Sequence, residues 1–131
     1  MKNDVEIRQD VFAMVKASAI SSAISGEVRY LPRRKDSKSE DCIISVLDSD
    51  SKQIQDSIVN VNVYVPNIDN GGESLENIPR TEVLAKICEE ALKYVYGDGF
   101  FISLEKQRIL PVNGKDEHVI NNRIRYKFNN E

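Results

Sequence analysis

The chain contains one histidine, His118, which is the first residue to consider for acid–base or nucleophilic chemistry. Nucleophilic catalysis needs a hydroxyl or thiol beside a base that a third group orients. His118 instead follows Glu117 and a stretch, residues 111–116, that is typical of a turn. The sequence therefore predicts a surface histidine in a turn rather than a catalytic base, and a protein that is not an enzyme.

Three carboxylates in a short segment are the only candidates for a divalent-metal loop: Asp48, Asp50 and Asp56. Their spacing lacks the central glycine and the terminal glutamate of a calcium-binding loop. Hydrogen bonds within Asx turns explain these residues better. We therefore predict no metal and no cofactor, and a metal-dependent nuclease that uses these aspartates stays the weaker alternative.

The two cysteines lie in apolar surroundings, Cys42 in an expected strand and Cys88 on the apolar side of an expected helix. No CxxC or Cys/His spacing connects them. Free cysteines in such positions behave as small hydrophobic residues. We expect two buried free thiols, with a disulfide or a metal pair as the alternatives.

The strongest strand signal, around which the other elements must pack, is residues 58–66 (IVNVNVYVP). Valine occupies every second position, so one side of the strand is dry and the other is mixed. Pro66 lacks an N–H and ends the strand. Turn-forming residues 48–52 separate it from a second β-rich run, residues 42–47, which predicts an antiparallel hairpin.

Helical periodicity indicates a first helix that begins at a cap residue, Asn3 or Asp4, and runs to about Lys16. Residues 18–26 are small and rich in serine, and they predict one short helical turn. Gly26 is placed to stop that turn in the left-handed conformation.

A second long helix follows the potential cap Asn77, and its apolar stripe continues to Val95, just before Gly97. Its far side carries charged residues from Arg80 to Lys93, which are typical of a solvated face. We expect this helix to cover the dry side of the central strand. The predicted shared core consists of Val61, Val63, Leu84, Ile87 and Ala91.

Two further β-rich runs, residues 100–110 and 120–128, close the chain with a turn at Asn113-Gly114 between them. Asn122 interrupts the apolar side of the last run, which suggests a bulge or the true start of the strand. A shorter run, residues 27–31, ends at a proline and predicts a short edge strand.

These elements predict an α+β fold: a single domain, residues 1–131, with a mostly antiparallel sheet whose β-hairpins pack against two helices. A chain of 131 residues that is 40% hydrophobic can bury one core but not two. Two segments are expected outside the core. Residues 33–41 predict a mobile charged loop, and residues 67–77 predict an exposed connection.

The composition excludes several classes of partner. Eighteen basic and 21 acidic side chains give a net charge of -3, which argues against an overall nucleic-acid footprint but allows a local basic patch. No segment approaches the roughly 20 apolar residues of a membrane span, and the N-terminus lacks the apolar run of a signal peptide. We expect a cytosolic protein without a membrane or sequence-specific nucleic-acid partner.

Charged rows on two elements form a candidate subunit interface. The last strand presents Arg123, Arg125 and Lys127 in alternation, which on a monomer would protect an edge strand. On a ring subunit this row could meet an acidic neighbour across the interface. The acidic candidates lie on the second long helix: Glu82, Glu89 and Glu90.

A second candidate contact lies in the charged loop, where three basic residues follow one another: Arg33, Arg34 and Lys35. We consider them a partner-contact loop, with an ordinary solvated loop as the alternative.

The order of the expected elements resembles that of the tail-completion or tail-terminator proteins of long-tailed bacteriophages and prophages. The resemblance lies in residues 11–17 (VFAMVKA), residues 23–30 (AISGEVRY), the alternating strand 59–65, and the helix 81–96 that leads to a terminal β-hairpin. The chain departs from the pattern in its charged insert, residues 33–41, and in its acidic, glycine-containing connection.

The resemblance implies a structural subunit that forms a ring, commonly a hexamer, at the head-proximal end of the tail tube. Such a ring ends tube growth and joins the neck, so its partners are copies of itself, the tail tube protein and head or neck connector proteins. Its location is the bacterial host cytoplasm during assembly and the virion tail or neck afterwards. The residues alone leave open a small cytosolic adaptor or regulatory domain that binds a peptide at an open sheet edge.

Overall fold

The structure, a computed structural model, describes the backbone of residues 2–49 and 54–129. Within these residues the helices are α1 (Asp4–Lys16), α2 (Ala19–Ala23) and α3 (Ile78–Leu92). The strands are β1 (Val28–Arg29), β2 (Cys42–Ser49), β3 (Ile54–Pro66), β4 (Ile68–Asn70), β5 (Glu73–Leu75), β6 (Tyr94–Tyr96), β7 (Phe100–Pro111) and β8 (Glu117–Asn129).

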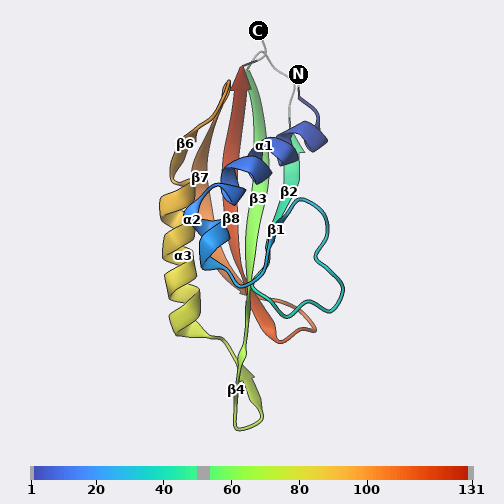
Figure 1. Cartoon of the computed structure of the whole chain (residues 1–131), viewed down its shortest axis with the longest axis vertical. Helices are drawn as coiled ribbons and strands as arrows, with labels where there is room; N and C mark the ends of the chain where they lie inside the picture. The colour runs from blue at the N-terminus through green and yellow to red at the C-terminus, as the bar shows by residue number, and fades with distance from the viewer. Residues whose placement is uncertain (1, 50–53, 130–131) are drawn as a thin grey trace.

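One large sheet has the strand order β1-β2-β3-β8-β7-β6, and β4 and β5 form a separate small hairpin. Neighbouring strands of the large sheet are antiparallel, except that β1 runs parallel to β2. The helices lie on one face of this sheet, and the β4–β5 hairpin projects from one end of the molecule (Figure 1). The predicted α+β class with a mostly antiparallel sheet is confirmed. We call the sheet face without helices the open face.

The core lies between the helices and the inner face of the sheet. Alternation in β3 directs four valines inward, each at most 1% exposed: Val59, Val61, Val63 and Val65. The helices contribute the buried residues Ile7, Val11, Val15, Ile20, Leu84, Cys88 and Leu92. Of the five predicted core residues, Val61, Val63 and Leu84 are fully buried, whereas Ile87 and Ala91 are half-buried against the core.

The first helix begins as predicted, because Asn3 and Glu6 cap each other. The Asn3 side chain accepts a hydrogen bond from the Glu6 backbone N–H at 2.9 Å, and the Glu6 carboxylate accepts one from the Asn3 backbone N–H at 3.3 Å. This reciprocal arrangement satisfies N–H groups that have no partner inside a helix.

Gly26 does not stop α2, and the prediction of a left-handed cap there was wrong. The helix ends at Ile24 in an extended conformation, and Gly26 has no positive φ. A side chain at this position is excluded for another reason, because a Cβ atom would lie 2.7 Å from the backbone oxygen of Glu40. Gly26 is therefore required by a close approach between two chain segments.

The second long helix ends earlier than predicted. Asn77 caps it as expected, accepting from the Arg80 N–H at 3.3 Å, but α3 ends at Leu92 and residues 94–96 form strand β6. These residues pair with residues 101–103 of β7. Aromatic and β-branched residues suit a strand, so pairing with a distant segment overrides the helical spacing of Val95.

Asn122 marks neither a bulge nor a strand start, and that interpretation was wrong. The strand starts at Glu117 and the bulge lies in β7, between Leu104 and Lys106. Asn122 is completely buried, donates to the backbone oxygen of Val61 at 3.0 Å, and accepts from the Gln107 side chain at 2.8 Å.

The connection between β3 and α3 consists largely of the β4–β5 hairpin, whose side chains are exposed. No helix among the described residues has both the length and the hydrophobicity to cross a bilayer.

Candidate functional site

His118 lies in β8 rather than in a turn, and this prediction was wrong. The end of β3 pairs with Glu117 and His118, so the strand begins earlier than its apolar pattern. The His118 Nδ1 atom lies 2.7 Å from the Asn67 side-chain oxygen, and the Nε2 atom lies 3.5 Å from a Glu76 carboxylate oxygen. An amide and a carboxylate engage the ring, so the contacts connect β8 to the segment before α3.

The aspartates considered as metal ligands are only partly placed. Asp50 and the side chain of Asp48 lie outside the described part of the chain. Asp56 accepts a hydrogen bond from Arg125 at 2.8 Å. Among the described residues, no three His, Cys, Asp or Glu side chains come together closely enough to hold a metal ion.

Cys42 and Cys88 are buried free thiols, as predicted. Burial raises the pKa of Cys42 above its usual range, and burial raises the pKa of Cys88 to about 11. The thiolate is the reactive form of cysteine. Both side chains are therefore protonated and unreactive near neutral pH.

Arg33 joins two strands and its own loop through a network that we call the Arg33 clamp. Its Nε atom donates to an Asp41 carboxylate oxygen at 2.9 Å, and its Nη1 atom donates to a Glu117 carboxylate oxygen at 2.6 Å. Its Nη2 atom donates to the backbone oxygens of Ser37 and Ser39 at 3.2 and 3.0 Å. The Arg33, Asp41 and Glu117 side chains are only 13%, 7% and 7% exposed.

The electrostatics of the clamp favour the charged forms. Burial raises the pKa of Asp41, but hydrogen bonds from Ser37 and Arg33 outweigh it, and the pKa lies below its usual value. Burial lowers the pKa of Arg33, but hydrogen bonds to Asp41 and Glu117 more than compensate and raise it. The guanidinium also lies over the Tyr64 ring, 4.4 Å from its centre. The clamp therefore holds β2, β3 and β8 together at one end of the open face.

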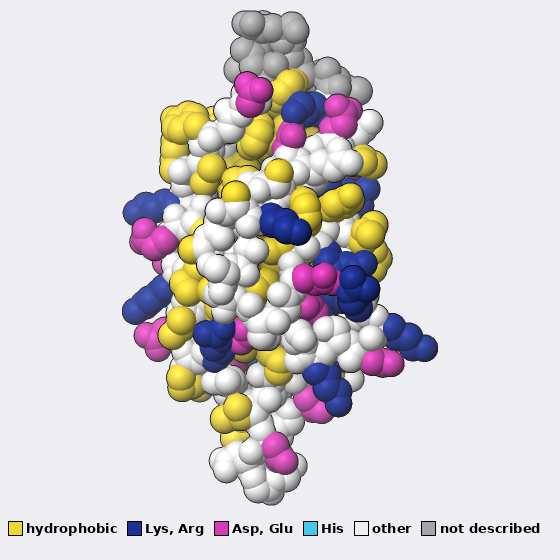
Figure 2. All heavy atoms as spheres, viewed as in Figure 1, with side chains coloured by type: hydrophobic (Ala, Val, Ile, Leu, Met, Phe, Trp, Pro, Cys, Tyr) yellow, Lys and Arg dark blue, Asp and Glu magenta, His cyan; other side chains and the backbone are white. Residues whose placement is uncertain are grey.

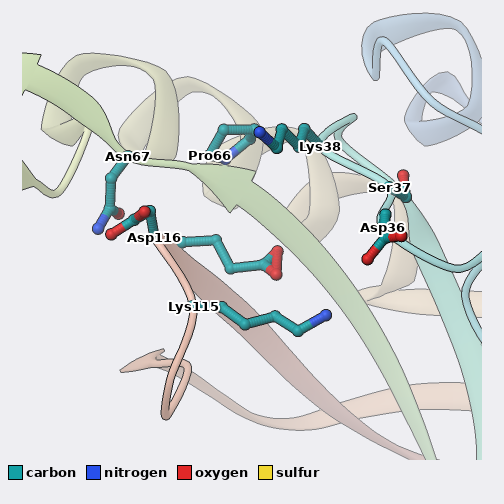
Figure 3. Close-up of a pocket in the computed structure, with 8 residues that line it drawn as sticks. Asp36, Ser37, Lys38, Pro66, Asn67, Lys115 and Asp116 are labelled. Atoms are coloured by element: carbon teal, nitrogen blue, oxygen red, sulfur yellow. The ribbon is translucent and has the colours of Figure 1, made fainter.

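A polar pocket of about 370 Å³ opens beside the clamp (Figure 3). It lies between the charged loop, the end of β3 and the turn before β8, and its lining is Asp36, Ser37, Lys38, Pro66, Asn67, Lys115, Asp116 and Glu117. Ligand sites are mostly apolar with a few convergent polar groups. This lining of mixed charges is instead typical of a solvated gap between loops.

The three basic residues of the predicted partner-contact loop have different surroundings. Arg33 is engaged within its own chain, whereas Arg34 and Lys35 are exposed. Arg34 pairs with Glu27 at 2.6 Å, yet 72% of its side chain is exposed. Arg34 and Lys35 are thus placed to contact a partner, and Arg33 shapes the loop that carries them.

Arg80 forms a second, partly buried link, although its position predicts a solvated helix face. It contacts both carboxylate oxygens of Glu40, at 2.7 and 2.8 Å, and the backbone oxygen of Ala23 at 2.5 Å. The Arg80 hydrogen bonds are the main cause that lowers the pKa of Glu40. This link connects the start of α3 to α2 and to the chain before β2.

The basic row Arg123, Arg125 and Lys127 lies on the open face, but β8 is a central strand between β3 and β7. The interpretation of this row as edge protection was therefore wrong. Arg125 pairs within its own chain, at 2.8 Å from Asp56 and 3.5 Å from Glu105. Arg123 and Lys127 form no ion pair with any other described residue.

The acidic candidates Glu82, Glu89 and Glu90 are exposed on α3, which covers the opposite face of the sheet (Figure 1). Glu82 lies 3.6 Å from Lys86, the weak pair expected at this spacing. The helix-covered face carries basic and acidic side chains in mixture (Figure 2). Within one subunit the two candidate rows point in opposite directions, so a contact between them requires two copies.

Both edges of the large sheet are only partly covered. Among the described residues, β1 pairs only with the first two residues of β2, and β6 pairs only with residues 101–103 of β7. Residues 44–49 of β2 and 104–111 of β7 therefore have a partner strand on one side only. The β2 stretch, from its start to Leu47, carries no charged residue, and Leu47 is 53% exposed. We call residues 44–49 the β2 edge.

Comparison with protein-family models and with curated proteins finds no match for the chain. The functional interpretation therefore depends on the geometry above.

Proposed function

We propose that the chain is a structural subunit of a phage or prophage tail, a tail-completion or tail-terminator protein. In this proposal, copies of the chain join into a ring at the head-proximal end of the tail tube. The ring ends tube growth and presents a surface to the neck. The observation that carries the self-association is the β2 edge, whose residues from Ile44 to Leu47 carry no charge.

An exposed strand edge without charges is unusual in a monomer. Unpaired N–H and C=O groups attract other strands, and soluble proteins normally block such edges with lysine, proline or a covering element. The β2 edge has no lysine or proline between its start and Leu47, and its only such features are Asp48 and a bulge between Val46 and Asp48. A partner strand would satisfy its backbone groups and cover Leu47, which supports strand addition at this edge.

The partner strand would be the second open stretch, residues 104–111 of β7, although Lys106, Pro111 and the bulge between Leu104 and Lys106 make this edge less receptive than β2. It lies on the opposite edge of the sheet and is shifted along the strands, although residues 104–107 lie in the same rows as residues 44–46. Since β2 and β7 run in opposite directions, copies in the same orientation would join by an antiparallel pair. Such a contact between two different surfaces is heterologous, and it gives a ring when the rotation closes.

The diagonal placement of the two open stretches requires each neighbour to be displaced along the strands. In closed sheets, stagger of this kind is linked to a tilt of the strands from the axis. We therefore expect strands that are tilted from the ring axis. Ion pairs between the basic row of one copy and acidic residues of its neighbour would be exposed. Each would contribute about 0–1 kcal/mol, so such pairs would set orientation rather than affinity.

A small adaptor is a second candidate function that the same observation supports. Its β2 edge would accept an extended peptide from another protein, and the chain would remain a monomer. The two candidates differ in whether copies of the chain bind each other.

Genome position and microscopy test the proposal together. We expect genes for tail tube and capsid proteins beside the gene for this chain. Adding the purified chain to that tube protein during assembly should give shorter tubes that carry a ring at one end in electron micrographs. Tubes of unchanged length without a terminal ring would contradict the proposal.

A further inference from the structure

The open face of the sheet concentrates basic side chains, although the whole chain has a net charge of -3. In addition to the row on β8, neighbouring β7 presents Lys106 and Arg108 on this face. Lys106 lies directly opposite Arg123 in the register of the two strands. Among the described side chains, the open-face carboxylates close to the row are Asp56 and Glu105, and both contact Arg125.

Four cations on this face lack an ion pair with another described residue: Lys106, Arg108, Arg123 and Lys127. They lie on two adjacent strands, from the row of Arg108 to the row of Lys127. Because side chains on one face repeat about every 6.8 Å along a strand, this band is roughly 20 Å long.

Three aromatic rings lie at one end of this band. Tyr96 and Phe101 are stacked, with ring centres 5.7 Å apart, and Tyr94 lies 5.4 Å from each of them. Tyr94 and Tyr96 are 60% and 73% exposed. The Lys127 ammonium lies 6.0 Å from the Phe101 ring, so the rings and the cations form one continuous surface.

On the side of the band toward β2, strand β3 carries the amides of Asn60 and Asn62, and Asp56 is the one described carboxylate of this strand near the band. Asn121 donates to the side-chain oxygens of Asn62 and Asn60, at 2.7 and 3.3 Å. A polyanion that lies on the band therefore meets no row of carboxylates on this side.

We infer that the open face binds single-stranded nucleic acid without base specificity. Cations that follow a strand and aromatic rings that accept stacked bases are the two components of such sites. A single strand matches the whole surface, because its phosphates meet the cations while its bases stack on the exposed rings. The inference concerns the face of one subunit, so it does not depend on association through the β2 edge.

Fluorescence anisotropy with a labelled oligo(dT) of about 16 nucleotides tests this inference. We expect binding at low salt, weaker binding of a duplex of the same length, and weaker binding of polyglutamate. Replacing both Lys106 and Arg108 with alanine should lower the slope of log K against log salt by about 0.7 for each lost phosphate contact. The matched control, Lys86→Ala on α3, which covers the opposite face of the sheet, should leave affinity and slope unchanged.

The aromatic rings are tested separately. Tyr96→Ala should weaken oligo(dT) binding by about 5- to 150-fold with an unchanged salt slope, since stacking is not a charge interaction. Tyr96→Phe keeps the ring and should bind like the wild type, and thermal unfolding checks that each variant is folded.

Three results would overturn the inference. They are an absence of oligo(dT) binding at low salt, an equal loss of affinity in the α3 control, and polyglutamate binding as tight as oligo(dT) binding with no effect of Tyr96→Ala. The last result would instead assign the face to an acidic protein.

Discussion

Replacement of Arg33 by methionine should destabilise the protein strongly, because the Arg33 clamp is buried. All five N–H groups of the guanidinium have acceptors, and the substitution removes them together. It leaves the Asp41 and Glu117 carboxylates, each 7% exposed, without their cation. Breaking a buried pair in this way costs about 3–5 kcal/mol, a large part of the roughly 5–15 kcal/mol that stabilises a domain.

The loss should also depend on pH. The pKa of Asp41 lies below its usual value in the folded wild type, so the unfolded state binds more protons as the pH falls through about 4. Acid therefore removes stability from the wild type. In the Arg33→Met variant the pKa of Asp41 is less depressed, so acid removes less stability. The difference between the two proteins should narrow as the pH falls from 7 to about 3, with most of the change below about 4.

Urea unfolding followed by circular dichroism measures this effect at both pH values. With a slope of about 1–3 kcal/mol per molar urea, a loss of about 3 kcal/mol lowers the midpoint by about 1–3 M. Arg34→Met is the matched control, because its side chain is 72% exposed and should change the midpoint little. Two results would refute a buried clamp. One is a loss of unfolding free energy below about 1 kcal/mol at pH 7, which is typical of a surface pair. The other is a stability difference between wild type and variant that does not narrow at the lower pH.

Three further substitutions test individual contacts by urea unfolding. Gly26→Ala should cost about 1–3 kcal/mol, because its Cβ would lie 2.7 Å from the Glu40 backbone oxygen; an unchanged midpoint would disprove the close approach. Asn122→Ala should cost about 1–3 kcal/mol, since it leaves the buried Val61 oxygen without its side-chain donor; a stabilised variant would be inconsistent with this contact. Tyr126→Phe removes the hydrogen bond to Asp10 and should cost about 1.5–3 kcal/mol, whereas a neutral effect would show that the hydroxyl is dispensable.

Periodicity predicted most of the fold, because burial on one face imposes its spacing on the sequence. The alternating valines of β3 and the closing hairpin of β7 and β8 follow this rule. Periodicity did not predict the end of α3, because the position of Val95 fits both the apolar stripe of a helix and the alternation of a strand. Only pairing with residues 101–103 decides between the two structures, and that pairing is not visible in local spacing.

The buried Arg33 clamp and the partly buried Arg80–Glu40 pair could not be predicted from local patterns. Arg33 and Glu117 are 84 residues apart in sequence, and Arg80 and Glu40 are 40 residues apart. Charged residues in a loop or on a helix normally face solvent, so the sequence indicates exposure for both arginines. The basic row on β8 was recognised, but its central place in the sheet follows from the pairing of β8 with β3 and β7.

Sedimentation velocity across a concentration series tests most directly the claim that copies of the chain associate through the β2 edge. The wild type should form a larger species as its concentration rises. Leu47→Lys places a charge on the exposed edge and should keep the chain monomeric. Leu75→Lys is the matched control on the β4–β5 hairpin, where the leucine is 40% exposed, and it should assemble like the wild type. A wild type that stays monomeric at every concentration, or a Leu47→Lys variant that assembles as well as the wild type, would contradict association through this edge.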